Sequence, residues 1–122
     1  QIGFSTVRDI KKEETLFTEG DLSKSLFIVR KGKLSIRKRM REGKYVELAH
    51  LLPGELLGEM SFFDRNKRSA SAVALEATQL LEIKFEAFDA HLKNVPPYFK
   101  TIMTAVAERL RKADELYKRV AL

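Results

Sequence analysis

The chain has 122 residues, of which 44% are hydrophobic, and a formal net charge of +6. This length suits a single domain, residues 1–122, that buries a core without disulfides, and the sequence contains no cysteine. No apolar run of about 18 residues occurs and the first residue is Gln1, so we expect neither a membrane span nor a signal peptide, and we expect a piece of a larger protein.

The first two thirds of the chain predict short strands. Residues 1–11 carry Ile2, Phe4 and Val7 at mixed spacing and predict a helical lead-in. Residues 12–84 predict about eight strands separated by short turns, the clearest being 15–17, 26–29, 34–40, 45–49, 69–75 and 80–84. Because no long helix separates them, these strands predict an antiparallel double-sheet roll.

Basic residues concentrate in one part of the predicted roll. The eight in question are Arg30, Lys31, Lys33, Arg37, Lys38, Arg39, Arg41 and Lys44. They could attract nucleic acid or anionic lipid. Alternatively they belong to a solvated hairpin, in which Leu34 and Ile36 point inward and Lys33, Ser35 and Arg37 outward. No aromatic side chains interleave with the charges to stack on bases, so we favour the hairpin and expect no direct nucleic-acid binding.

Residues 57–73 have the composition of an anion site. Gly58 lacks a Cβ and can bring the backbone close to a ligand, and residues 60–63 predict one helical turn whose free N–H groups suit a phosphate. Arg68 follows nine residues after Glu59, so it can face those donors while Glu59 accepts from hydroxyl groups. The alternative is a plain turn at Gly58-Glu59 followed by an exposed Arg68 without a partner.

From Phe85 onward the apolar spacing becomes helical. Phe85, Phe88 and Leu92 share one face of a short helix, which Pro96 ends. A second helix is expected over about 98–119, with Pro97 in its first turn. Its apolar residues follow the three- and four-residue steps of a coiled-coil seam, namely Met103, Val106, Leu110, Ala113, Tyr117 and Val120. The seam could dock on the chain's own roll or pair with a second copy.

The anion-site stretch resembles the phosphate-binding cassette of the cyclic nucleotide-binding domain family. That family includes the catabolite activator protein, kinase regulatory subunits and cyclic nucleotide-gated channels. The residues that match in order and spacing are Gly58-Glu59, Ser61 and Arg68-Ser69-Ala70. Two departures are Phe62, where the family usually carries an aliphatic residue, and Ser23, where a smaller one is usual.

The resemblance implies a mainly β fold with flanking helices: an antiparallel double-sheet β-roll, a short cassette helix and two C-terminal helices. It also implies that Glu59 accepts from the ribose 2′-hydroxyl, Arg68 pairs with the cyclic phosphate and Ser69 adds its hydroxyl or amide. Backbone N–H groups would complete the cradle. The expected ligand-binding set is Gly58, Glu59, Met60, Ser61, Arg68, Ser69 and Ala70.

Contacts to the base are expected from the last helix, at Arg109, Ala113 and Asp114. Ala113 and Asp114 stand where bacterial activators present hydroxyl residues to adenine, and neither has a hydroxyl. The choice between cyclic AMP and cyclic GMP therefore stays open.

The function implied is that of a cytoplasmic regulatory domain. It would bind a cyclic nucleotide, cyclic AMP before cyclic GMP, form a homodimer through its last helix, and pass binding to an effector domain or partner protein outside the chain. A ligand-free structural or dimerisation domain of the same fold is the alternative. Only His50 and His91 are present, with no cysteine and no serine in a nucleophile elbow, so we expect no enzyme, no metal and no cofactor.

Overall fold

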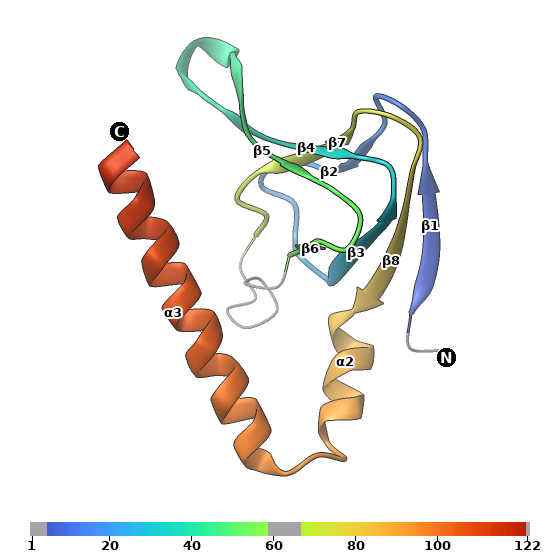
Figure 1. Ribbon diagram of the computed structural model, residues 1–122, viewed down its shortest axis with the longest axis vertical. Helices are drawn as coiled ribbons and strands as arrows, with labels where there is room; N and C mark the ends of the chain where they lie inside the picture. The colour runs from blue at the N-terminus through green and yellow to red at the C-terminus, as the bar shows by residue number, and fades with distance from the viewer. Residues whose placement is uncertain (1–4, 59–66, 122) are drawn as a thin grey trace.

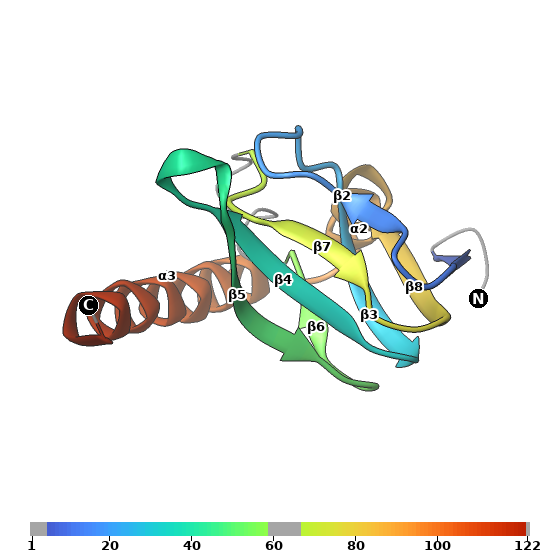
Figure 2. The ribbon, with the colours of Figure 1, turned by 90° about the horizontal axis from the view of Figure 1, so that it is seen from above.

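The computed structural model describes residues 5–58 and 67–121, which form two four-stranded antiparallel sheets followed by two helices. Figures 1 and 2 show the sheets as two layers of a roll, with the helices leaving it at one end. The predicted double-sheet roll with two C-terminal helices is therefore confirmed. The cassette helix expected at residues 60–63 lies outside the described residues.

Each sheet combines strands that are distant in sequence. The first sheet has the order β1 (Thr6–Ile10), β8 (Thr78–Lys84), β3 (Ser25–Lys31) and β6 (Leu56–Leu57). The second has the order β2 (Thr15–Phe17), β7 (Ser71–Ala74), β4 (Leu34–Arg39) and β5 (Tyr45–Leu51). A single 3-10 turn, η1 (Arg41–Gly43), joins β4 to β5. Apart from the β4–β5 hairpin, consecutive strands belong to different sheets, which places β2 and β3 in opposite layers of one interior.

The core explains the continuous apolar run of β3. Phe27 and Val29 point between the sheets, into a cluster completed by Ile10, Leu34, Ala74 and Leu80. Leu26 lies on the other face of the strand and packs with Ile83 and Phe85, so α2 (Phe85–Leu92) covers that face. Because both faces of β3 are buried, its sequence lacks the polar alternation of a half-exposed strand.

The first residues of the described chain are extended, so the prediction of a helical lead-in over residues 1–11 is wrong for Thr6–Ile10. These residues form β1, which pairs antiparallel with β8. Ile10 is buried in the core, and the Arg8 guanidinium donates to the Glu82 carboxylate at 3.1 Å. The β-branched residues of this segment favour an extended backbone once a partner strand is available.

The hairpin β4–β5 has the predicted orientation with one difference. Leu34 faces the core, and Arg37 lies on the opposite face of the sheet with Ser35. Ser35 is nevertheless fully buried. Its hydroxyl donates to Glu47 at 2.5 Å and accepts from the Arg37 Nε at 3.1 Å, so these two side chains cover it. Side chains of the hairpin itself therefore cover a residue that the alternation alone places in solvent.

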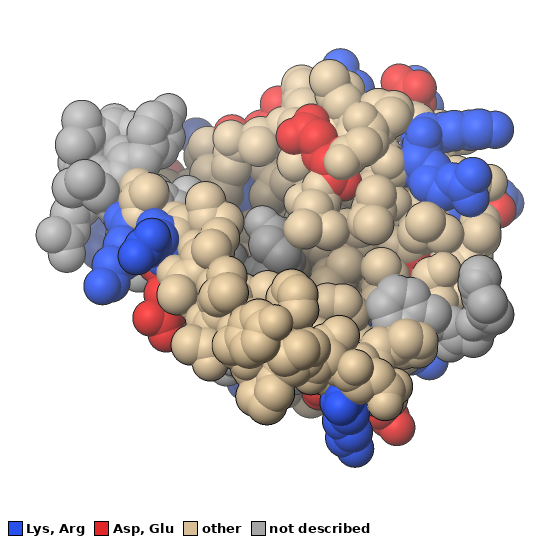
Figure 3. Space-filling model, turned by 60° about the horizontal axis from the view of Figure 1, so that its bottom comes forward, with Lys and Arg blue, Asp and Glu red and all other residues tan. Residues whose placement is uncertain are grey.

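The last helix, α3 (Pro97–Ala121), extends away from the two sheets (Figures 1 and 2). It exposes large apolar side chains along its first half, namely Tyr98, Phe99, Ile102, Val106 and Leu110. Figure 3 views the end of the molecule where α2 turns into α3 and shows a broad area without charged side chains. Of the predicted seam, Met103 is half-buried and Ala113 exposed, while the side chains of Tyr117 and Val120 lie outside the description.

Candidate functional site

Arg68 lies in the segment that leads into β7. Its backbone is held by hydrogen bonds to a turn that is distant in sequence, Glu19-Gly20-Asp21. The Arg68 N–H donates to the Asp21 carbonyl at 2.8 Å, and the Gly20 N–H donates to the Arg68 carbonyl at 2.9 Å. Gly20 adopts a φ of +94°, a conformation that glycine accepts readily. The Glu19-Gly20-Asp21 turn thus determines where the arginine enters the roll.

The Arg68 side chain is buried next to Gly58. Only 6% of the residue is exposed, and its Nη2 donates to the Ser25 carbonyl at 2.7 Å. Its Nε and Nη1 atoms are buried and have no hydrogen-bond partner among the described residues. A charged group that is buried with unused donors is strongly disfavoured unless an acceptor completes it. The arrangement therefore leaves two buried donors of a charged group available to an acceptor.

Gly58 packs directly against this guanidinium. Its φ is +90°, and a Cβ built on it would lie 2.5 Å from the Arg68 Nη1 and 3.2 Å from the Ser25 carbonyl oxygen. Any side chain at this position would therefore be strained and would displace the arginine. The requirement for glycine is one of close approach to Arg68, whereas the predicted approach of the Gly58 backbone to a ligand stays a prediction.

Charges around Arg68 partly offset the effect of its burial. Burial lowers the pKa of Arg68 from its ordinary value, while the carboxylates of Asp21 and Glu82 act in the opposite direction. An arginine side chain remains protonated in proteins over the physiological range. The site thus presents a full positive charge to an incoming anion.

Glu82 is held on the inner face of the first sheet by two donors. The Ser25 hydroxyl donates to Glu82 at 2.6 Å, and Arg8 donates at 3.1 Å. Burial acts to raise the pKa of Glu82, but the Ser25 hydroxyl and Arg8 outweigh it, so the pKa is below its ordinary value. Ser25 therefore contacts both charged groups. Its hydroxyl donates to the Glu82 carboxylate, and its backbone carbonyl accepts from Arg68.

The structure brings some of the predicted ligand-binding residues together. Gly58 and Arg68 are in contact, Ala70 is buried and Ser69 is exposed. Three further members of the set, Glu59, Met60 and Ser61, lie outside the described residues.

The predicted base contacts lie on α3. Arg109 and Ala113 are exposed there. The side chain of Asp114 lies outside the description. These three assignments stay predictions.

Residues of other strands surround the Arg68 guanidinium, and the sequence alone does not predict them as parts of the site. The guanidinium carbon lies 4.1 Å from the ring centroid of Phe17 and 5.6 Å from that of Phe27. Together with Ser25 and Glu82, these residues come from β2, β3 and β8. Their pattern in the sequence indicates only buried strands, so no local signal marks them as parts of a site.

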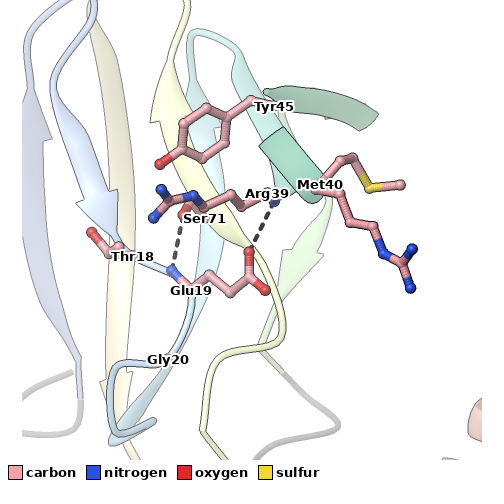
Figure 4. Close-up of a pocket in the computed structure, with 8 residues that line it drawn as sticks. Thr18, Glu19, Gly20, Arg39, Met40, Tyr45 and Ser71 are labelled. Carbon is pink, nitrogen blue, oxygen red and sulfur yellow. Dashed lines mark hydrogen bonds between the residues drawn. The ribbon is translucent and has the colours of Figure 1, made fainter. Parts of the chain in front are cut away.

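A separate cavity of about 560 Å³ lies on the outer face of the second sheet, the face that carries Ser35 and Arg37 (Figure 4). It is lined by Thr18, Glu19, Gly20, Arg39, Met40, Arg41, Tyr45 and Ser71. The Glu19 N–H donates to the Ser71 hydroxyl at 2.9 Å, and the Arg39 N–H donates to the Glu19 carboxylate at 3.0 Å. Arg68 does not line this cavity, so the candidate site is distinct from it.

Two other kinds of feature are absent from the described part of the chain. No group of three or more His, Asp or Glu side chains there could hold a metal ion. Within residues 5–58 and 67–121, no helix is both long and apolar enough to cross a membrane.

Residues 7–94 match the family model described as the cyclic nucleotide-binding domain. The chain belongs to this family. The match includes the Gly58–Arg68 contact and the strands that support it. The resemblance of the cassette stretch to this family is therefore confirmed.

Among curated proteins, the chain is similar to the cyclic AMP receptor protein of Thermus thermophilus, with 41% identity over 99 residues, 81% of this chain and 46% of that protein. It is 26% identical over 106 residues to a CRP-like cAMP-activated global transcriptional regulator of Mycobacterium tuberculosis, covering 87% of this chain and 47% of the relative. The chain thus spans about half the length of these relatives.

Among solved structures, the fold is similar to that of the Thermus thermophilus catabolite activator protein. The TM-score is 0.78 at 35% identity, and the match covers 98% of this chain and 56% of that one. One expectation is overturned by the relatives. They include transcriptional regulators, so the expectation of no direct nucleic-acid binding is wrong.

Proposed function

We propose that residues 1–122 are one regulatory domain that binds a cyclic nucleotide at Arg68 and transmits binding through its C-terminal helices to an effector outside the chain. The observation that carries this is the Arg68 guanidinium, which is buried against Gly58 and whose Nε and Nη1 have no hydrogen-bond partner in the part of the chain that the structure describes. A cyclic phosphate carries one negative charge and acceptor oxygens, which match these donors.

The remaining contacts follow the family pattern. Glu59 would accept from the ribose 2′-hydroxyl, while Ser69 and the backbone N–H groups from Gly58 to Ser61 would complete the phosphate cradle. The base would meet α3 near Arg109, Ala113 and Asp114. Cyclic AMP is the first candidate, since the relatives include a cyclic AMP receptor and a cAMP-activated regulator.

A mechanical connection between the site and the helices supports the transmission. Arg68 bonds the carbonyl of Ser25, and the next residue, Leu26, packs with Ile83 and Phe85 at the start of α2. The Phe85 N–H also donates to the Lys24 carbonyl at 2.9 Å. A ligand that shifts Arg68 would bias the position of α2 by its difference in affinity for the two arrangements.

The apolar stripe of α3 supports a homodimer through that helix. Ile102, Val106 and Leu110 recur every four residues and are each about half exposed. The same stripe is the observation that favours the alternative function, a dimerisation domain of the same fold without a ligand. We place the protein in the cytoplasm because bacterial transcriptional regulators, such as its relative, act there.

Calorimetric titration of the chain with cyclic AMP and cyclic GMP separately tests the proposal. We expect micromolar or tighter binding of at least one nucleotide, which would also name the base. No heat and no thermal stabilisation at millimolar nucleotide would reject nucleotide binding and leave the dimerisation domain.

A further inference from the structure

The guanidinium of Arg68 lies against two aromatic rings. Its central carbon is 4.1 Å from the ring centroid of Phe17, in β2, and 5.6 Å from that of Phe27, in β3. The two ring centroids are 6.1 Å apart, and the rings are tilted by 32°. Since β2 and β3 belong to different sheets, the guanidinium lies where the two layers meet.

We propose that Phe17 is a positioning residue of the nucleotide site, whose ring holds the charged Arg68 guanidinium in place before the phosphate arrives. This inference rests on the proposed function and adds to it a residue outside the cassette. Arg68 would touch the ligand, and Phe17 would act only through Arg68.

The ring suits this role because it stabilises the charge without using the donors that the ligand needs. A cation within about 6 Å of a ring centroid is attracted by the negative face of the ring, most strongly when the pair is desolvated. A carbonyl or carboxylate in the same place would instead pair with Nε or Nη1. Among the described residues these two groups have no hydrogen-bond partner, whereas Nη2 donates to the Ser25 carbonyl.

Phe17 is the better candidate of the two rings. It is the nearer one, and it is half-buried at the margin of the core. Phe27 is 3% exposed and belongs to the central cluster, so its loss would damage the whole fold. Phe17 can therefore be changed while the roll is kept.

The direction of the expected change in nucleotide affinity follows from the position of Arg68 in the protein without ligand. Without the ring, the buried guanidinium keeps a single hydrogen bond, and turning toward solvent becomes more favourable. The nucleotide must then bring Arg68 back on binding, so part of its affinity is lost. A ring-preserving change leaves the arginine in place and the affinity intact.

The binding test compares Phe17→Leu with Phe17→Tyr and with Phe88→Leu. Leucine keeps an apolar side chain but has no ring face, whereas tyrosine keeps the face. Phe88 is also half-buried but packs against the second cluster, at α2, so its replacement controls for lost packing. We expect about tenfold weaker cyclic AMP binding for Phe17→Leu and less than a threefold change for the other two. Equal affinity in Phe17→Leu and wild type would overturn the proposal, as would an equal loss in Phe88→Leu.

A measurement without nucleotide separates this proposal from the proposed function. In the NMR spectrum of the free wild-type chain, we expect the Arg68 Nε–H resonance to be shifted upfield by the Phe17 ring, and to return toward the ordinary arginine position in Phe17→Leu. An Arg68 resonance at the ordinary position in wild type would overturn the role of Phe17. A wild type that shows the shift but binds no nucleotide would reject the proposed function, and with it the role of Phe17 in binding, while the contact between Phe17 and the Arg68 guanidinium would stand.

Discussion

At the scale of single residues, Gly58 and Arg68 depend on each other. The guanidinium can occupy its position only because residue 58 has no side chain, since a Cβ there would lie 2.5 Å from the Arg68 Nη1. The two residues are ten positions apart in the sequence. The position of the Arg68 guanidinium requires glycine at position 58, because a side chain there would occupy the same space.

Gly58→Ala should therefore reduce both stability and nucleotide binding. The positive φ alone should cost about 1 kcal/mol of folding free energy or more. Displacement of the guanidinium should weaken cyclic AMP binding at least tenfold, because charge-assisted hydrogen bonds contribute roughly 1.5–3 kcal/mol each. Thermal unfolding and calorimetric titration measure the two effects.

Gly54→Ala is the matched control. Gly54 has a φ of +94° but nothing within 4 Å of its Cβ position, so its replacement brings the same backbone strain without touching Arg68. It should lose stability and keep nucleotide affinity. Equal affinity in the two alanine variants would show that the close approach at Gly58 is unimportant for the ligand.

At the scale of elements, β1, β8 and β3 are joined on their inner faces by polar side chains. Arg8, Glu82 and Ser25 come from one strand each, and their hydrogen bonds connect the edge of the first sheet to the carbonyl that holds Arg68. The depressed pKa of Glu82 means that its ionised form is favoured by folding.

This link predicts how stability depends on pH. A carboxylate with a lowered folded-state pKa stabilises the protein above its unfolded pKa, about 4.3 for glutamate, and that stability is lost as the pH falls through the folded-state pKa. Ser25→Ala removes one of the donors that lower it while keeping the backbone carbonyl. Urea unfolding between pH 7 and pH 3 should show a smaller loss of stability on acidification in Ser25→Ala than in wild type.

A neighbouring serine provides the control for that experiment. Ser23 is also buried, but its hydroxyl has no hydrogen-bond partner among the described residues. Ser23→Ala should keep the wild-type pH dependence. The coupling between Ser25 and Glu82 is absent if Ser25→Ala follows the wild-type curve as well.

Particular elements show which parts of the fold could be predicted from the sequence. The strand at β3 and the helix α2 follow from local apolar patterns, since an uninterrupted apolar run and a three- and four-residue spacing each have one simple interpretation. The segment at β1 was predicted as a helix because its apolar spacing is mixed, and its true partner, β8, lies far along the chain.

The residues of the candidate site likewise include some that could be predicted from the sequence and some that could not. Gly58 and Arg68 could be predicted as parts of one anion site, because the cassette is contiguous in sequence and its residue types have a specific chemistry. Phe17 and Ser25 could not, because they reach Arg68 only when the two layers are assembled. Local sequence carries no information on which strand lies opposite another in such a roll.

At the scale of the whole molecule, the roll and α3 differ in how far their apolar side chains are buried. The roll has its own core, whereas the first half of α3 exposes apolar side chains next to the uncharged area seen in Figure 3. A helix that leaves such a stripe unpartnered is suited to pair with another helix.

We therefore predict a dimer in sedimentation equilibrium at tens of micromolar. Leu110→Asp should produce a monomer, because it places a charge within the apolar stripe, while Lys112→Ala, an exposed position outside the stripe, should leave the dimer unchanged. A wild-type chain that stays monomeric with and without cyclic AMP would contradict pairing through α3.

The proposed function depends on the buried Arg68 guanidinium, which would bind the phosphate of a cyclic nucleotide. Its most direct test is the dissociation constant for cyclic AMP of Arg68→Ala beside that of Lys67→Ala, which removes the exposed cation one residue earlier. We predict at least a tenfold loss of affinity for Arg68→Ala and an affinity within twofold of wild type for Lys67→Ala. Wild-type affinity in a folded Arg68→Ala variant would contradict the account.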